Sequence, residues 1–114
     1  MKTYVGKFEN GEYRVVIEDD DGTGRVNYQE LPLRLDLANK SPTGFSWGYN
    51  GSGPAQLALA LLADALGEKE ALEIYQDFKR DFVAVLPAEW YAPEEEIRDV
   101  ANRLKSSLGA PGYS

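Results

Sequence analysis

Residues 54–67 read PAQLALALLADALG, a nearly unbroken apolar run bounded by a proline and a glycine. Proline suits the first position of a helix, Gly53 before it is a tolerated N-cap, and glycine after such a run commonly ends a helix. Apolar side chains point in almost every direction around the predicted helix, interrupted only by Gln56 and Asp64. Because a helix that is apolar nearly all round is buried on several sides, we expect this one to be the central, buried helix of the core.

The residues before it are predicted to form strands. Asn10-Gly11 separates two runs with the period of two, and this dipeptide favours a type I′ hairpin turn. After an acidic turn at residues 19–24, residues 25–31 are expected to form a third strand with Val26 and Tyr28 on one face. The apolar residues that set the first two strand faces are Tyr4, Gly6 and Phe8, then Tyr13, Val15 and Ile17.

Two more helices are predicted after the central one, over residues 69–86 and 93–108. The first is expected to end before Pro87, with an apolar stripe that includes Leu72 and Val85. The second begins at a proline followed by three glutamates, which are favourable beside a helix N-terminus. The tail at residues 109–114 is expected to fray.

The fold class that follows is α+β, with a small antiparallel N-terminal β-meander packed on a C-terminal bundle of about three helices. We expect residues 1–114 to form a single domain, since this length suits one core. Its parts are a β-rich region (1–36), a Gly-rich aromatic loop (41–54) and a helical region (54–108).

Composition excludes several kinds of chemistry. The chain has no cysteine and no histidine, which removes disulfides, thiolate nucleophiles and imidazole bases or ligands. Nineteen acidic against twelve basic residues give a formal charge of −7, so a basic protein surface is a more natural partner than nucleic acid. No apolar run is long enough to span a membrane, and the first residues contain no apolar leader, so we expect a cytoplasmic protein without a membrane partner.

Residues 19–30 match the ligand spacing of a calcium-binding EF-hand loop, from Asp19 to Glu30. Their flanks do not match, because the preceding run is β-branched and Pro32 stands where the second helix would grow. No second loop is present to make the usual pair. We therefore expect a charged hairpin turn with no bound metal, and the calcium hypothesis is kept only as an alternative.

The Gly-rich loop is the segment that most resembles a binding site. It combines glycines, hydroxyls and three aromatic rings, and it leads into a helix N-terminus, where unpaired amides attract anions. Two interpretations stay open: a pocket for a ligand, or a packing hinge whose rings lie on the buried helix. As ligand-binding candidates we take Ser41, Thr43, Trp47, Tyr49, Gly51, Ser52 and Gln56.

The same segment carries a family resemblance. SPTGF at residues 41–45, WGY at 47–49 and GSGPAQLALA at 51–60 resemble a family of small uncharacterised prokaryotic proteins, a domain of unknown function also found on mobile elements and phages. The resemblance extends over nearly the whole chain. It implies no activity, cofactor or site residue.

Two functions are therefore compared. The first is a non-catalytic module that captures a phosphate-bearing or nucleotide-like small molecule at the Gly-rich loop and the following helix N-terminus, for instance in phage–host conflict. The alternative is an acidic interaction module that inhibits or recruits a basic protein partner such as a defence nuclease complex. No residues are posed for acid–base catalysis, so we expect neither an enzyme nor a cofactor. A homo-oligomer is a further possibility, since pairing of two copies about a two-fold axis would complete a half-formed pocket.

Overall fold

The computed structural model describes residues 1–108; the tail expected to fray, residues 109–114, lies outside the described part. The elements in chain order are β1 (Lys2–Glu9), β2 (Glu12–Asp20), β3 (Val26–Glu30), α1 (Ser52–Leu66), α2 (Glu68–Asp81), the 3-10 helix η1 (Val83–Val85), β4 (Glu89–Pro93) and α3 (Glu94–Leu108). The predicted α+β class is confirmed.

The strands form one antiparallel sheet in the order β3-β2-β1-β4. The turn between β1 and β2 has positive φ at both Asn10 (54°) and Gly11 (78°), as a type I′ turn requires. The three-strand meander predicted from the sequence is therefore confirmed, and β4 adds a fourth strand beside β1.

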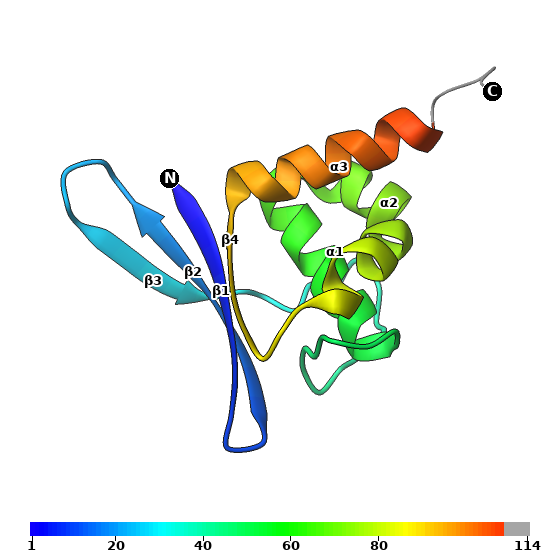
Figure 1. Ribbon diagram of the computed structural model, residues 1–114, viewed down its shortest axis with the longest axis horizontal. Coiled ribbons are helices and arrows are strands. Elements are labelled where there is room, and N and C mark those ends of the chain that lie inside the picture. Colours follow the sequence, from blue (N-terminus) through cyan, green and yellow to red (C-terminus); the bar gives the residue numbers. More distant parts are fainter. Residues whose placement is uncertain (109–114) are drawn as a thin grey trace.

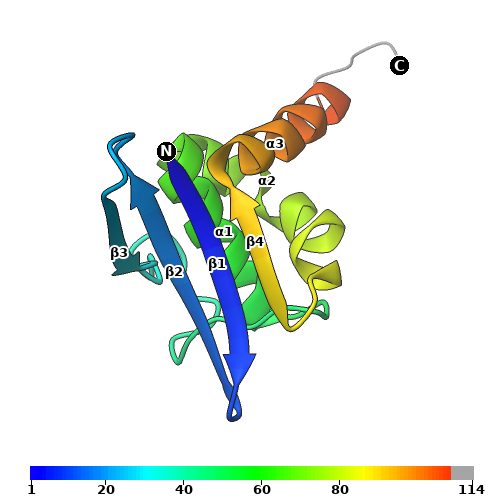
Figure 2. The same ribbon diagram turned by 60° about the vertical axis from the view of Figure 1, so that its left-hand side comes forward.

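The molecule has two layers, with the helices on one face of the sheet (Figure 1). Figure 2 shows the sheet in front and the helices behind it, so that no helix of the described residues lies on the opposite face of the sheet. The β2–β3 hairpin extends away from the helices. In α1, every residue from Gly53 to Ala63 is buried, which confirms its expected place at the centre of the core.

The region between α2 and α3 differs from the prediction made from the sequence, which was wrong here. α2 ends at Asp81 rather than Leu86, and Val85 is 74% exposed instead of lying on a buried stripe. The chain is held here by long-range contacts: the Gly48 N–H donates to the Val83 carbonyl at 3.1 Å. Because the helix does not continue, the residues after η1 form the extended strand β4, which pairs with β1 and buries Trp90 against the core. Leu72, expected on the same stripe, is also exposed.

No helix among residues 1–108 is long and apolar enough to cross a membrane.

Candidate functional site

The Gly-rich loop places its tryptophan inside the core. The Trp47 side chain is 3% exposed, and its ring meets Tyr13 and Trp90 edge to face, with centroids 4.7 and 5.6 Å apart. Its indole N–H donates to the Pro87 carbonyl at 2.8 Å. These contacts join the loop, the β1–β2 hairpin and the segment before β4, so this ring packs the core and offers no free stacking face.

Gln56 has an equally internal role, although it is polar and fully buried. Its Oε1 accepts hydrogen bonds from the N–H groups of Lys40 (2.7 Å) and Ser41 (3.0 Å). Its Nε2 donates to the carbonyls of Leu33 (2.6 Å) and Ala38 (3.1 Å). All four hydrogen-bonding positions of the amide are thus occupied, and the side chain fixes the irregular segment 33–41 to α1.

The other loop candidates are closer to solvent. Ser41 Oγ donates to the Gly44 carbonyl at 2.7 Å, while Thr43 and Ser52 are exposed. Tyr49 is 49% exposed, and its hydroxyl lies 2.8 Å from Ser46 Oγ. The Tyr49 ring also covers Gly51, where an added Cβ would lie 2.7 Å from the ring. The structure therefore gathers Tyr49, Gly51 and Ser52 at the start of α1 and separates them from the buried Trp47 and Gln56.

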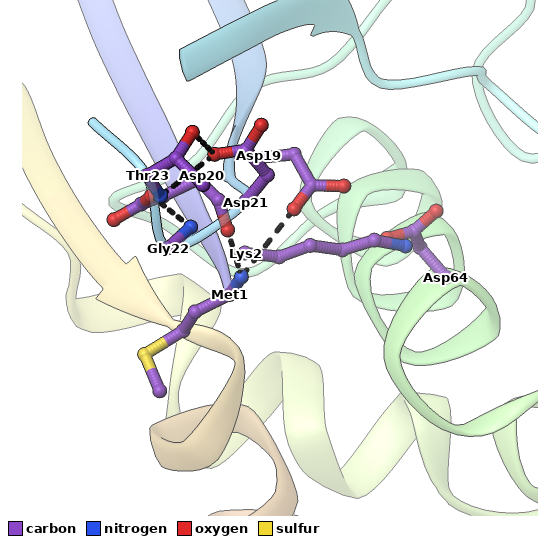
Figure 3. Close-up of polar contacts among 8 residues, drawn as sticks. All are labelled: Met1, Lys2, Asp19, Asp20, Asp21, Gly22, Thr23 and Asp64. Carbon is purple, nitrogen blue, oxygen red and sulfur yellow. Dashed lines mark hydrogen bonds and ion pairs between the residues drawn. The ribbon is translucent and has the colours of Figure 1, made fainter. Parts of the chain in front are cut away.

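The acidic turn at residues 19–24 is held by its own carboxylates (Figure 3). Asp21 Oδ1 accepts hydrogen bonds from the Thr23 N–H (2.9 Å) and Oγ1–H (2.6 Å), and this pairing lowers the pKa of Asp21. Asp20 Oδ1 accepts from the Gly22 N–H at 2.7 Å. The N-terminal ammonium group lies beside Asp19 and donates to the Asp20 carbonyl. Within residues 1–108, no group of three or more acidic side chains is placed to hold a metal ion.

A second polar cluster joins the sheet to α1. The Tyr4 hydroxyl donates to Asp64 Oδ2 at 2.6 Å, and Lys2 Nζ lies 3.2 Å from the same oxygen (Figure 3 shows the Lys2 and Asp64 side chains). Burial, followed by the hydrogen bond to Asp64, raises the pKa of Tyr4. The phenol therefore stays protonated, as a donor to the carboxylate must, and the cluster anchors β1 to the central helix.

The surface that the sequence analysis did not identify is the open sheet face, the side of the sheet turned away from the helices. A depression of about 550 Å³ lies on it. Val5 and Val16 are cross-strand neighbours that line it, and Val5 is only 3% exposed although no helix of residues 1–108 covers this face. Tyr28 on β3 and Tyr91 on β4 border it, 66% and 59% exposed. The face thus has one apolar cross-strand pair, Val5 and Val16, between the strands that carry two exposed phenol rings.

The charges on the open sheet face are mostly negative. Its two cations are paired, Lys7 with Glu89 (3.8 Å) and Arg14 with Glu30 (3.6 Å). Among the described residues, no cation lies within ion-pair distance of three further glutamates that line the depression, namely Glu9, Glu12 and Glu18. The Tyr91 hydroxyl donates to Glu89 at 2.8 Å, and this bond raises the pKa of Tyr91.

The one signal for this face in the sequence was the shared face of Val26 and Tyr28. Both lie on the open side of β3, opposite Asp20 and Glu18 of β2. The sequence pattern could not indicate that the helices leave that side uncovered, because this depends on where they pack.

These features define a small α+β protein in which a four-stranded antiparallel sheet backs onto three helices and exposes its other face. Residues 4–103 match the family model described as a family of unknown function (DUF6166), and the chain belongs to that family. The resemblance to an uncharacterised family noted in the sequence is thereby confirmed. Comparison with curated proteins and with solved structures gave no significant match.

Proposed function

We propose that this chain is a non-catalytic interaction module that binds a basic partner protein through the open sheet face. The observation that carries the proposal is the pair of exposed rings, Tyr28 and Tyr91, which line a depression together with Val5, Val16 and several charged side chains. Tyrosine is enriched in protein interfaces because it supplies a large rigid contact area together with a polar tip. An uncovered sheet face with exposed rings beside an apolar cross-strand pair is suited to a protein surface.

The charges select the class of partner. Because Lys7 and Arg14 are neutralised by neighbouring glutamates, the remaining carboxylates give the depression a negative rim. Complementary charge steers association and fixes the register of an interface. A nuclease or another nucleic-acid-binding protein fits this chemistry, since such proteins carry an exposed basic surface for phosphates.

Site-directed photo-crosslinking in the native cell tests the proposal. A photoreactive residue at position 91 is compared with one at Leu72, which is 45% exposed on α2, a helix on the covered side of the sheet. We expect position 91 to capture a protein with a pI above about 9, and Leu72 not to capture it. Capture should fall steeply as salt is raised from about 50 to about 500 mM, because exposed charge pairs are screened.

A charge-reversal variant tests whether capture depends on the carboxylates of the open sheet face. Glu18→Lys changes the sign of one carboxylate on the open sheet face and should weaken capture, whereas Glu73→Lys, at an exposed position on α2, should not. Equal capture from both positions, or capture that is insensitive to salt and to Glu18→Lys, contradicts the proposal.

The nucleotide hypothesis has less geometric support, since the Trp47 ring and the Gln56 amide are occupied internally. It now depends on Tyr49 and Ser52 at the start of α1 and stays a prediction that ligand screening can test.

A further inference from the structure

The outer edge of β3 carries free backbone groups. The Leu31 N–H donates to the Val15 carbonyl at 3.1 Å, and the Asp21 N–H donates to the Arg25 carbonyl at 3.2 Å. In an antiparallel pair, hydrogen-bonding residues alternate along each strand, so odd-numbered residues from 25 to 31 face β2. The N–H and C=O groups of the remaining residues, Val26, Tyr28 and Glu30, therefore point away from the sheet.

This edge lacks the protection that natural edge strands usually have. Prolines, lysines or a covering segment normally prevent unwanted pairing. Within Val26–Glu30, β3 has neither proline nor lysine, and all five of its residues are exposed; the next outward position, Pro32, lies beyond the end of the strand. The opposite edge differs: by the same alternation, starting from the Phe8 N–H to Ala88 carbonyl bond, its outward residues include Pro93, which has no N–H to offer. Within the described sheet, only the edge of β3 thus offers both an N–H donor and a C=O acceptor at every outward residue.

Charge identifies the occupant. The hairpin from residue 18 to residue 30 contains five carboxylates and one guanidinium, and it extends away from the helices (Figure 1). A second copy of the chain pairing along β3 would bring two such hairpins together, which like-charge repulsion disfavours. A cationic strand meets complementary charge instead. Its outward side chains would flank Tyr28 and Glu30 and so extend the open sheet face.

We propose that the β3 edge accepts an extended, lysine- or arginine-rich segment of the partner as a fifth strand. The inference rests on the proposed function and specifies how the partner binds: main-chain hydrogen bonds to Val26, Tyr28 and Glu30 supply affinity, and cationic side chains supply specificity. The occupant is a protein strand, because the outward groups include both donors and acceptors at strand spacing.

Amide hydrogen exchange on the full chain tests this directly. The probes are short synthetic peptides that alternate lysine or arginine with valine or threonine. Binding should slow exchange at the amides of Val26, Tyr28 and Glu30 about ten-fold or more. Exchange at Asn27 and Gln29 should stay as it is, because these amides already face β2. A period-two protection pattern is the mark of strand addition.

Two variants separate the contribution of the Tyr28 backbone N–H to binding from that of the Tyr28 ring. Tyr28→Pro removes the central outward N–H and should abolish peptide binding. Tyr28→Thr keeps that N–H, so it should weaken binding through the lost ring but leave the period-two protection pattern in place at saturating peptide. If Tyr28→Pro disturbs the sheet, the exchange pattern of the unsubstituted chain still decides. Peptide binding without protection of the three outward amides overturns strand addition but leaves the proposed interaction function intact. Absence of binding by every peptide also overturns strand addition, while crosslinking at position 91 decides the proposed function separately.

Discussion

Replacing Gln56 distinguishes a packing hinge from a ligand pocket. Gln56→Met keeps the length and approximate volume of the side chain but removes all of its hydrogen-bonding groups. Two N–H groups and two carbonyls in the segment 33–41 then lose their partners. If this side chain is structural, the substitution should lower the stability of the chain without any ligand present.

The magnitude follows from the contacts. Four hydrogen bonds at about 1 kcal/mol each amount to roughly 4 kcal/mol, and partial compensation by the added apolar burial leaves about 3 kcal/mol. Domains of this size have stabilities of about 5–15 kcal/mol, so the loss is a substantial fraction. A change of this size lowers the Tm by roughly 10 °C.

The assay is thermal and chemical denaturation, with Gln76→Met as the matched control. Gln76 lies on α2 and is exposed, so its replacement should change stability by less than about 0.5 kcal/mol. A local measurement accompanies the global one: the amides of Lys40 and Ser41, which donate to Gln56, should exchange faster in Gln56→Met. A Tm within about 2 °C of the unsubstituted chain, with unchanged exchange at these two amides, would refute the structural role.

Three other predictions concern packing, the acidic turn and the loop. Gly6→Ala should cost about 2 kcal/mol in chemical denaturation, because the new Cβ would lie 2.2 Å from the Trp90 ring; Trp90→Phe in the same chain should restore part of the loss, and full stability of Gly6→Ala alone would contradict this packing. The pKa of Asp21 is lowered, so the contacts of the acidic turn are fully formed above the ordinary aspartate pKa and are lost as pH falls through the lowered pKa. The chemical shift of the residue-23 amide, followed by NMR, should therefore change with pH around the pKa of Asp21. Thr23→Val removes the hydroxyl donor and should raise that pKa. If the Gly-rich loop binds nucleotides, they should raise the Tm, and Tyr49→Ala should abolish the rise while the fold is retained; an unchanged Tm across a panel of nucleotides counts against that hypothesis.

Local signals in the sequence determined the parts of the fold that were predicted correctly. Asn10-Gly11 specifies its turn through backbone preference alone, and the apolar run after Pro54 specifies a buried helix through its composition. β4 was missed because it depends on distant partners. Its buried residues, Trp90 and Ala92, provide too short an alternation to predict a strand, and the space for the Trp90 ring exists only because its cross-strand neighbour is Gly6.

The candidate site likewise combines features that local sequence predicts with features that depend on distant partners. The sequence correctly marked the Gly-rich loop as unusual, and the close approaches at Gly51 and Gly53 show a physical reason for its glycines. It could not decide between a pocket and a packing hinge, because the partners that hold Trp47 and Gln56 inward come from residues 33–41 and from Pro87. The exposed face of the sheet is likewise a tertiary property that no local pattern encodes.

The contrast between the two sheet faces bears on where function lies. On the covered face, Tyr4, Trp47 and Trp90 are each at most 4% exposed and packed against specific neighbours, so folding accounts for them. Tyr28 and Tyr91 are more than half exposed, and an exposed ring contributes little burial to stability. Their place beside a depression with a negative rim is therefore not explained by the fold. Substituting both by threonine, a good strand former, should leave the Tm nearly unchanged yet reduce the amount of basic partner that co-purifies with the chain, which is the behaviour expected of residues that serve binding rather than folding.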